Sequence, residues 1–358
     1  MGVPLFDTKT ALAPLRAELD AAIDRVLDAG VFVLGPETEA FEAEFAAYVG
    51  ADEAIGVANG TEAITIAVRA LGVGPGDEVI VPSFTFFASA EAIPPTGAVP
   101  VFCDIDPQTF CVTPETVKAV MTEKTKAVVA VHLFGNVAPV EEIEALGVPV
   151  VEDAAQAAGS QGPYGRPGAL GTLATFSFYP SKNLGCFGDG GAITTSDPVL
   201  ARRVRSLRFH GSEDKVRHEE VGYNSRLDEL QAAILRVQLP HLDAWAQRRG
   251  EAAGWYEELL GDVLTLPQAT PGSTPAWHIV VARHRRADDV IAVLTEHGVG
   301  ARAYYRVPTH AQPAFGLKLD LPGTAVAARE HLALPVSATI TREQVEEVAG
   351  VVRDARLD

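Results

Sequence analysis

The sequence is poor in cysteine. Its 358 residues contain three, Cys103, Cys111 and Cys186, and no two of them form a CxxC pair. An odd count without such a pair favours a reducing compartment over a disulfide framework. Cys186 lies close to a lysine of interest, but we expect it to be a buried small apolar side chain rather than a reactive thiol.

Basic charge and long apolar runs are also scarce. The chain has 29 Lys and Arg against 47 Asp and Glu, which gives a formal net charge of −18. This balance argues against a nucleic-acid partner, because proteins bind the phosphate backbone through clustered cations. No apolar stretch approaches the ~20 residues that a membrane helix needs, and the first residues lack a basic region followed by an apolar run. We therefore expect a cytoplasmic protein with neither a membrane nor a nucleic-acid partner.

Alternating strand and helix patterns are plentiful. Residues 14 to 49 predict two helices around the turn "GVFVLGPE", and from about residue 54 strands and helices alternate. The segments "TKAVVAVHLF" and "VPVVED" are continuous apolar runs, as in parallel strands buried on both faces. The pattern predicts an α/β fold whose sheet is covered by helices on both faces.

The length exceeds that of a typical single domain, so two lobes are expected. A helical stretch, "SRLDELQAAILRVQL", ends at Pro240, and a second helical segment follows it. We place the boundary there, with a large domain and N-terminal arm over 1–240 and a small C-terminal α+β domain over 241–358.

Three segments of the first domain carry polar residues suited to chemistry. In "GVANGTEAITIAVRALG" an apolar strand leads into Asn59, Gly60 and Thr61 and then a helix. Free amides at a helix N-terminus bind anions, and the Thr61 hydroxyl can donate a further hydrogen bond. The alternative is that Asn59 or Thr61 only caps the helix.

The second and third segments supply an acid and an amine. "GVPVVEDAAQAAG" delivers Asp153 at the end of a buried strand, where an acid is costly unless it meets a cation or caps a turn. "FSFYPSKNLGCFGDGGAI" places Lys182 between aromatics and a glycine-rich turn, and enclosure there would lower its pKa and make the amine nucleophilic. A phosphate cradle, an acid for a ring nitrogen and an amine for an aldehyde are together what pyridoxal 5′-phosphate (PLP) requires.

These segments resemble the sugar aminotransferases of the DegT/DnrJ/EryC1/StrS family, a branch of the fold-type I PLP enzymes. The likeness extends over nearly the whole chain, through "GVFVLGPETEAFEAEFAAYVG", "NGTEAI", "GDEVIVPSFTFFAS", "VEDAAQAAGS", "SFYPSKNLGCFGDGGAI", "GYNSRLDELQAAIL" and "LPVSATIT". The resemblance implies a large lobe with a mostly parallel seven-stranded sheet between helices, and a small C-terminal α+β lobe.

The resemblance also implies a role for individual positions. Lys182 corresponds to the lysine that binds PLP covalently and moves the proton between cofactor and substrate. Asp153 pairs with the pyridinium nitrogen, which keeps the ring an electron sink. The remaining cofactor contacts implied by the family are Gly60, Thr61, Phe86, Gln156, Ser177 and Asn224. Phe86 stacks on the ring, Gln156 lies near the ring hydroxyl, and Asn224 reaches the phosphate of the neighbouring subunit, so a homodimer with shared sites is implied.

The implied reaction is a transamination. L-glutamate converts PLP to pyridoxamine 5′-phosphate, and the amine then passes to the keto carbon of a nucleotide-linked sugar. "GYNSRLDELQAAILRVQLPHLDAW" and "DAAQ" are most similar to members acting on 3-keto sugars, such as dTDP-3-keto-6-deoxyhexoses or UDP-linked 3-keto-uronates; C4 amination of a 4-keto sugar is the alternative. Tyr305 and His310, in "YYRVPTHAQPAFG", are candidates for the sugar pocket. The alternatives are that Tyr305 only packs in the core and that His310 is an ordinary loop residue.

Two other features have competing interpretations. Asp104 and Asp106 follow a strand in "VFCDIDPQTF", as in metal-dependent glycosyltransferases, but Asp106-Pro107 also opens ordinary turns, and we expect no metal. The basic residues of "ARRVRSLR" (Arg202, Arg203, Arg205 and Arg208) are expected on a solvated helix face rather than in a phosphate clamp.

Overall fold

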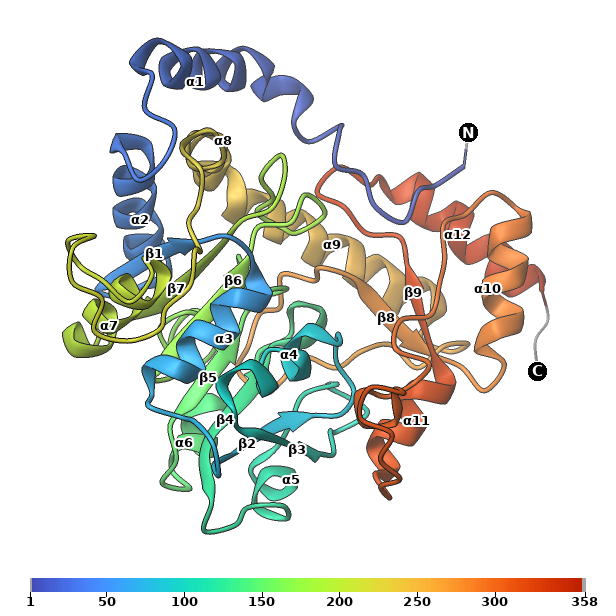
Figure 1. Ribbon diagram of the computed structural model, residues 1–358. Coiled ribbons are helices and arrows are strands. Elements are labelled where there is room, and N and C mark those ends of the chain that lie inside the picture. Colours follow the sequence, from blue (N-terminus) through green and yellow to red (C-terminus); the bar gives the residue numbers. More distant parts are fainter. Residues whose placement is uncertain (1, 356–358) are drawn as a thin grey trace.

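A computed structural model of the chain describes residues 2–355, and it is built around one large sheet (Figure 1). The sheet has seven strands in the order β1-β7-β6-β5-β4-β2-β3. Their bounds are β1 Glu53–Val57, β2 Glu78–Pro82, β3 Val99–Cys103, β4 Thr125–Val131, β5 Val150–Asp153, β6 Leu173–Ser177 and β7 Gly191–Thr195. All neighbours pair in parallel except β7, which is antiparallel to both β1 and β6. The expected mostly parallel seven-stranded sheet is confirmed.

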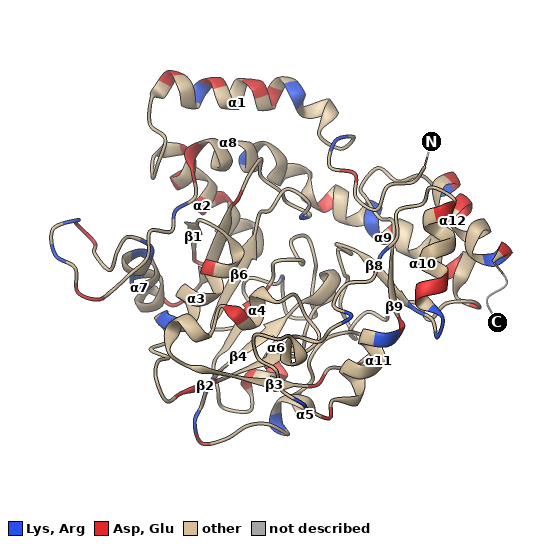
Figure 2. Ribbon diagram, turned by 45° about the vertical axis from the view of Figure 1, so that its right-hand side comes forward, with Lys and Arg blue, Asp and Glu red and all other residues tan. Residues whose placement is uncertain are grey.

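Helices cover both faces of this sheet. On one face α3 (Gly60–Ala70) and α7 (Pro198–Arg208) join a core with Ile55 and Ile193. On the other, α2 (Pro36–Val49) and α8 (Glu229–Gln238) pack against β6, where the rings of Phe45 and Phe176 meet edge to face at 4.8 Å. Because both faces are covered, the central strands are apolar throughout, and Figure 2 shows charged residues mainly on outer helices and loops.

The remaining elements of the first 240 residues are short, apart from α1. The two expected helices within 14–49 are α1 (Arg16–Ala29) and α2, and Gly30 ends α1 with a φ of 65° that favours glycine. Short α-helices are α4 Ala88–Glu91, α5 Pro114–Lys118 and α6 Val140–Glu144; 3₁₀ turns are Ala13–Leu15, Pro94–Thr96, Leu133–Gly135 and Leu239–His241.

The C-terminal third forms its own small sheet and core. Strands β8 (Val280–Arg283) and β9 (His331–Leu334) pair antiparallel. The helices around them are α9 Leu242–Leu260, α10 Ala287–Glu296, α11 Pro322–Glu330 and α12 Arg342–Asp354, with a 3₁₀ turn at Thr309–Ala311. Pro240 lies in the one-turn link between α8 and α9. Division into domains at 240/241 stays a proposal; Val3 of the N-terminal arm packs into this C-terminal core and accepts a 2.8 Å hydrogen bond from Gly300 N–H.

Two expectations need correction. The stretch beginning "SRLDEL" becomes helical only at Glu229, because Asp228 is still extended in a bridge with Val33. The basic residues of α7 are not one solvated face. Arg202 is exposed, but Arg208 is buried and its guanidinium contacts Glu42 at 2.5 Å and donates to the carbonyl of Gly56 at 2.7 Å. Arg205 pairs with Glu42 of α2 and Glu53 of β1, both at 2.8 Å, so Arg205 and Arg208 tie α7 to the sheet edge.

Among the residues that the structure describes, no helix combines the length and apolar character needed to span a bilayer.

Candidate active site

The candidate residues gather where the parallel strands end. Strand β1 runs in the same direction as β2 to β6, since both it and β6 oppose β7. The carboxyl ends of β1, β2, β5 and β6 therefore lie at one edge of the sheet. The chain continues from these four ends into Asn59–Thr61, Ser83–Phe86, Asp153–Gln156 and Ser177–Lys182 respectively.

Lys182 lies on a tight turn after β6. Its N–H donates to the carbonyl of Tyr179 at 2.8 Å, and the Tyr179 N–H donates to the Ser177 hydroxyl at 3.3 Å. Desolvation lowers the pKa of the Lys182 amine to about 8, against a smaller opposing effect of the Asp153 carboxylate. A lysine with this pKa has far more neutral amine at pH 7 than a solvated one, which is the condition for attack on an aldehyde.

Asp153 is buried and held by defined donors. The Ser89 hydroxyl donates to its Oδ2 at 2.7 Å, and the Ala155 N–H donates to Oδ1 at 3.2 Å. Ser89 is itself 3.0 Å from the Thr85 hydroxyl. A carboxylate fixed in this way, with neutral donors only, is prepared to pair with a cationic ring nitrogen.

The structure shows the helix cap at the start of α3, and the anion site there stays a prediction. Asn59 caps the helix, since its side chain accepts from Glu62 N–H at 2.9 Å. Gly60 and Thr61 follow in the first turn, whose amides have no acceptor within the helix. A Cβ at Gly60 would lie 2.8 Å from Cβ of Ser177, so only glycine allows the two strand ends to approach this closely. The result is a group of free amides and hydroxyls of the kind that binds a phosphate.

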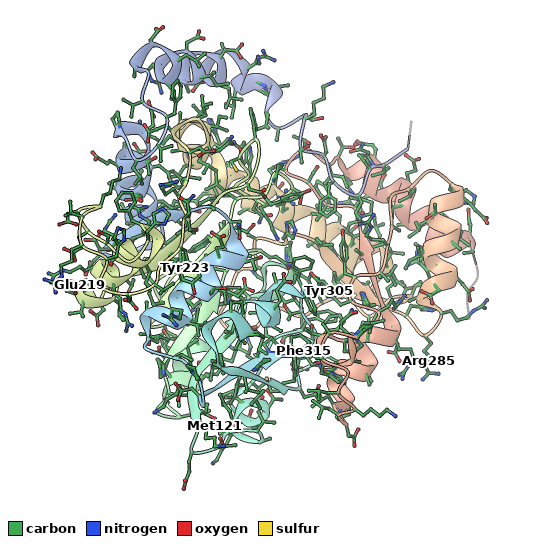
Figure 3. All side chains as sticks on the ribbon, in the orientation of Figure 1. Met121, Glu219, Tyr223, Arg285, Tyr305 and Phe315 are labelled. Atoms are coloured by element: carbon green, nitrogen blue, oxygen red, sulfur yellow. The ribbon has the colours of Figure 1, made fainter. Side chains whose placement is uncertain are left out.

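Aromatic side chains form the next wall. The ring of Phe86 is 56% exposed and stands 6.3 Å from that of Tyr305, which leaves one apolar face free for stacking. Gln156 accepts from Phe134 N–H at 2.7 Å and donates to the Tyr305 hydroxyl at 3.3 Å. Tyr305 has a φ of 63°, unusual for a bulky residue, and Figure 3 shows it near the centre of the molecule.

Of the two remaining predicted site residues, His310 contacts the segment after β2 at this sheet edge, whereas Asn224 lies outside the group. His310 is buried, and its Nδ1 shares a hydrogen bond with the Ser83 hydroxyl. Asn224 is exposed on the loop between α7 and α8, in a bridge with Phe209. The role predicted for Asn224 therefore requires a second subunit, while that of His310 in the sugar pocket stays a prediction.

Sequence reasoning missed Ser89 and Thr85, although both lie in "FTFFAS". Two hydroxyls four residues apart were the available signal, although Thr85 lies in the bend before α4 and only Ser89 is in the helix. This signal did not reveal that they face Asp153, since that contact joins residues 64 apart in the chain. The residues present fit PLP: an amine of lowered pKa, a buried acid, an exposed ring and an anion cradle lie at one sheet edge.

The comparisons with known proteins agree with this geometry. The model of the DegT/DnrJ/EryC1/StrS aminotransferase family matches residues 14–353, and the chain belongs to that family. It is accordingly a PLP-dependent aminotransferase, since PLP is the cofactor of the family. The fold-type and cofactor implied by the sequence motifs are confirmed.

Particular relatives can be named. The chain is 46% identical to a dTDP-3-amino-3,4,6-trideoxy-α-D-glucose transaminase of Streptomyces venezuelae, over 98% of this chain and 96% of the relative. It is 42% identical to a UDP-N-acetyl-3-dehydro-α-D-glucosamine 3-aminotransferase of Acidithiobacillus ferrooxidans, over 98% and 97%. The solved structure of DesV from S. venezuelae, in complex with a ketimine intermediate, matches with a TM-score of 0.96 and 45% identity over 100% of this chain and 99% of that one.

Family membership removes the glycosyltransferase alternative. Asp104 has a different contact: its carboxylate accepts from the N–H groups of Gly323 and Thr324 at 2.9 and 2.7 Å, at the start of α11. Asp106 accepts from Gln108 N–H at 2.9 Å in the turn that its proline predicted. Cys186 is buried, as expected, with its thiol 3.0 Å from the Phe178 carbonyl.

Proposed function

We propose that the protein transfers the amino group of L-glutamate to the keto carbon of a dTDP-linked 3-keto-6-deoxyhexose, in the cytoplasm. The observation that carries this proposal is the convergence of Lys182, Asp153 and the cradle of Gly60, Thr61 and Ser177 at one sheet edge. The identity to 3-amino-sugar transaminases supports the position of amination. One relative is named for a UDP-linked sugar, so both dTDP- and UDP-linked substrates have to be tested.

Each residue has a defined task in this proposal. PLP supplies an electron sink that stabilises the carbanion formed when the substrate loses a proton. The Asp153 carboxylate holds the ring nitrogen protonated, and Ser89 holds Asp153. The Lys182 amine, with a pKa of about 8, is half-buried beside the acid and accepts and returns the proton at the substrate carbon. The cradle binds the phosphate, and Phe86 covers the ring.

The experiment runs the reaction in reverse. Purified enzyme loaded with PLP is mixed with dTDP- and UDP-linked 3-amino and 4-amino sugars, and the conversion of the pyridoxal absorbance to that of the pyridoxamine form is recorded. We expect the dTDP-linked 3-amino-6-deoxyhexose to react fastest. Response to 4-amino sugars alone would overturn the position of amination, and no response to any sugar would overturn the substrate class.

The proposal includes a homodimer in which Asn224 contacts the partner's cofactor phosphate. The loop from Phe209 to Asp228 stands out from the molecule (Figure 2), and within residues 2–355 the Asn224 side chain makes no hydrogen bond. Near the bridge between Val33 and Asp228, the apolar side chains of Phe32 and Val33 are 50% and 44% exposed. An exposed apolar segment beside a polar loop is typical of a surface that another copy covers.

Asn224→Ala tests that arrangement. We expect the variant to remain a dimer by analytical ultracentrifugation but to lose PLP more readily on dialysis, by about tenfold for one lost hydrogen bond to a phosphate. Asn136→Ala is unsuitable as a control because Asn136 is buried; Gln247→Ala, on exposed α9, is the matched amide. A monomeric enzyme with full activity would refute the shared site.

A further inference from the structure

A cavity beside the lysine loop is lined by Lys182 but not by Asp153. Its volume is about 290 Å³, and its walls come from the N-terminal arm, the lysine loop and the helix α9. Phe6, Leu12 and Trp245 supply apolar surface, while Lys9, Lys182 and Arg249 supply positive charge. The amine that reacts with the cofactor therefore lines a second chamber, which none of the other predicted cofactor contacts lines.

Arg249 is an unpaired guanidinium in this chamber. Its Nη1 has only long contacts, 3.4 to 3.5 Å, to the carbonyls of Trp277, His278 and Val336. Its Nε is buried with no hydrogen-bond partner, and across residues 2–355 no carboxylate forms an ion pair with it. Desolvation lowers its pKa to about 10. Arg208, a buried arginine, is by contrast paired with Glu42.

The surroundings of Arg249 do not compensate its charge. His278 is buried with an unpartnered Nδ1, and desolvation together with the charges of Lys182 and Arg249 holds its pKa well below the usual value. Asp7 also lines the cavity, but its carboxylate accepts from the N–H groups of Lys9 and Thr10 at 3.0 and 2.9 Å, within the arm. Three long contacts to backbone carbonyls do not neutralise this charge, and a desolvated cation that no carboxylate neutralises is unfavourable. This indicates that a ligand supplies the missing anion.

We propose that Arg249 binds a carboxylate of the amino donor, with the arm of residues 6–12 and Trp245 forming the walls around its carbon chain. The inference rests on the proposed function and adds a residue that selects the donor. A planar guanidinium matches a carboxylate with two parallel hydrogen bonds. The cavity lies at the lower limit of the ~300–1,000 Å³ typical of small-molecule sites, which suits a free amino acid better than a nucleotide-linked sugar.

The test separates the two half-reactions of the PLP-loaded enzyme. In Arg249→Gln we expect the glutamate concentration for half-maximal conversion to the pyridoxamine form to rise about 10- to 100-fold, as for a lost charged hydrogen bond. The reverse half-reaction, from amino sugar, should change less than about twofold. Arg249→Lys keeps the positive charge but lacks the planar guanidinium. Its glutamate concentration for half-maximal conversion should lie between those of the unchanged enzyme and Arg249→Gln. Arg248→Gln, whose exposed side chain pairs with Glu251 at 2.7 Å, is the matched control and should behave as the unchanged enzyme.

Two measurements do not depend on turnover. Glutarate, which has both carboxylates but no amine, should bind the unchanged protein in calorimetry and bind Arg249→Gln at least about tenfold more weakly. The thermal midpoint of ligand-free Arg249→Gln should not fall, because the variant loses an uncompensated charge. A fall in the midpoint with equal damage to both half-reactions would show a structural arginine and overturn the proposal.

Other outcomes of these experiments would show whether Arg249 binds the amino donor or the sugar substrate. Damage confined to the amino-sugar half-reaction would assign Arg249 to the sugar diphosphate and refute a donor site. If the unchanged enzyme accepts no amino sugar, the proposed function fails, while glutarate binding that depends on Arg249 still supports the donor site. Should Arg249→Gln not fold, Arg249→Lys with unaltered glutarate binding and glutamate dependence would refute it.

Discussion

Two groups of polar residues near Lys182, the Asp153 side and the Arg249 side, differ in how completely their charged atoms are hydrogen-bonded. On the Asp153 side, the carboxylate receives hydrogen bonds from Ser89 and the Ala155 N–H before any cofactor binds. On the Arg249 side, a guanidinium and the imidazole of His278 have buried nitrogens without partners. A group that acts in every cycle on a resident cofactor can be fixed permanently, whereas a group that exchanges ligands must keep its hydrogen bonds available. The four predictions below test this difference.

The largest effect is expected at the residue that both sides share. Lys182→Ala removes the amine that attacks the aldehyde and moves the proton, so transamination should fall by about 10⁴-fold, the upper end for a positioned acid–base group. Borohydride reduction followed by peptide mapping should label Lys182 in the unchanged enzyme and no residue in the variant. Labelling at another lysine would contradict the assignment.

Asp153→Asn tests the Asp153 side, where the hydrogen bonds are already made. An amide cannot hold the ring nitrogen protonated, so the rate of both half-reactions should fall by about 10² to 10⁴-fold, while the protein still retains PLP through its phosphate cradle. Stopped-flow absorbance measures the rate, and dialysis measures retention. If only glutamate affinity changed, the two sides would have been assigned the wrong way round.

Ser89→Ala measures what the preset hydrogen bond contributes. Loss of one donor to Asp153 should lower the rate of each half-reaction by about threefold to tenfold. The concentration of either substrate that gives half-maximal rate should change little. Thr116→Ala, remote from the site in the capping box of α5, is a control for general destabilisation. A rate unchanged by Ser89→Ala would show that Asp153 needs no support.

The smallest effect is a pH dependence. The Lys182 pKa is about 8 in the folded chain and 10.5 for a free lysine. Between these values the unfolded chain binds more protons, so the stability of the cofactor-free protein should rise as pH increases from 8 to 10.5. Thermal unfolding of the unchanged protein and of Lys182→Met, compared across this range, measures it. A constant difference between the two proteins would refute the lowered pKa.

How much the sequence predicts depends on whether a contact is local. The buried strands ending at Asp153 and Ser177 and the glycine at position 60 have local patterns, and the fold and the cradle follow from them. Arg249 looks like any charged residue of a solvated helix in "AQRRGEAAGWYEELL", and its isolation depends on Val336 and Trp277, distant in sequence. Arg208 was misinterpreted for the same reason, because its partner Glu42 lies 166 residues away.

The position of β7 between β1 and β6 has a consequence for synthesis on the ribosome. Strand β1 has no neighbour in the sheet other than β7, so it can be docked only after residues 191–195 have left the exit tunnel. The phosphate cradle depends on that docking, because it brings Gly60 against Ser177. The nascent polypeptide therefore cannot acquire its vitamin-derived coenzyme until more than half of it has been translated, and vitamin B6 should protect only longer stalled chains from proteolysis.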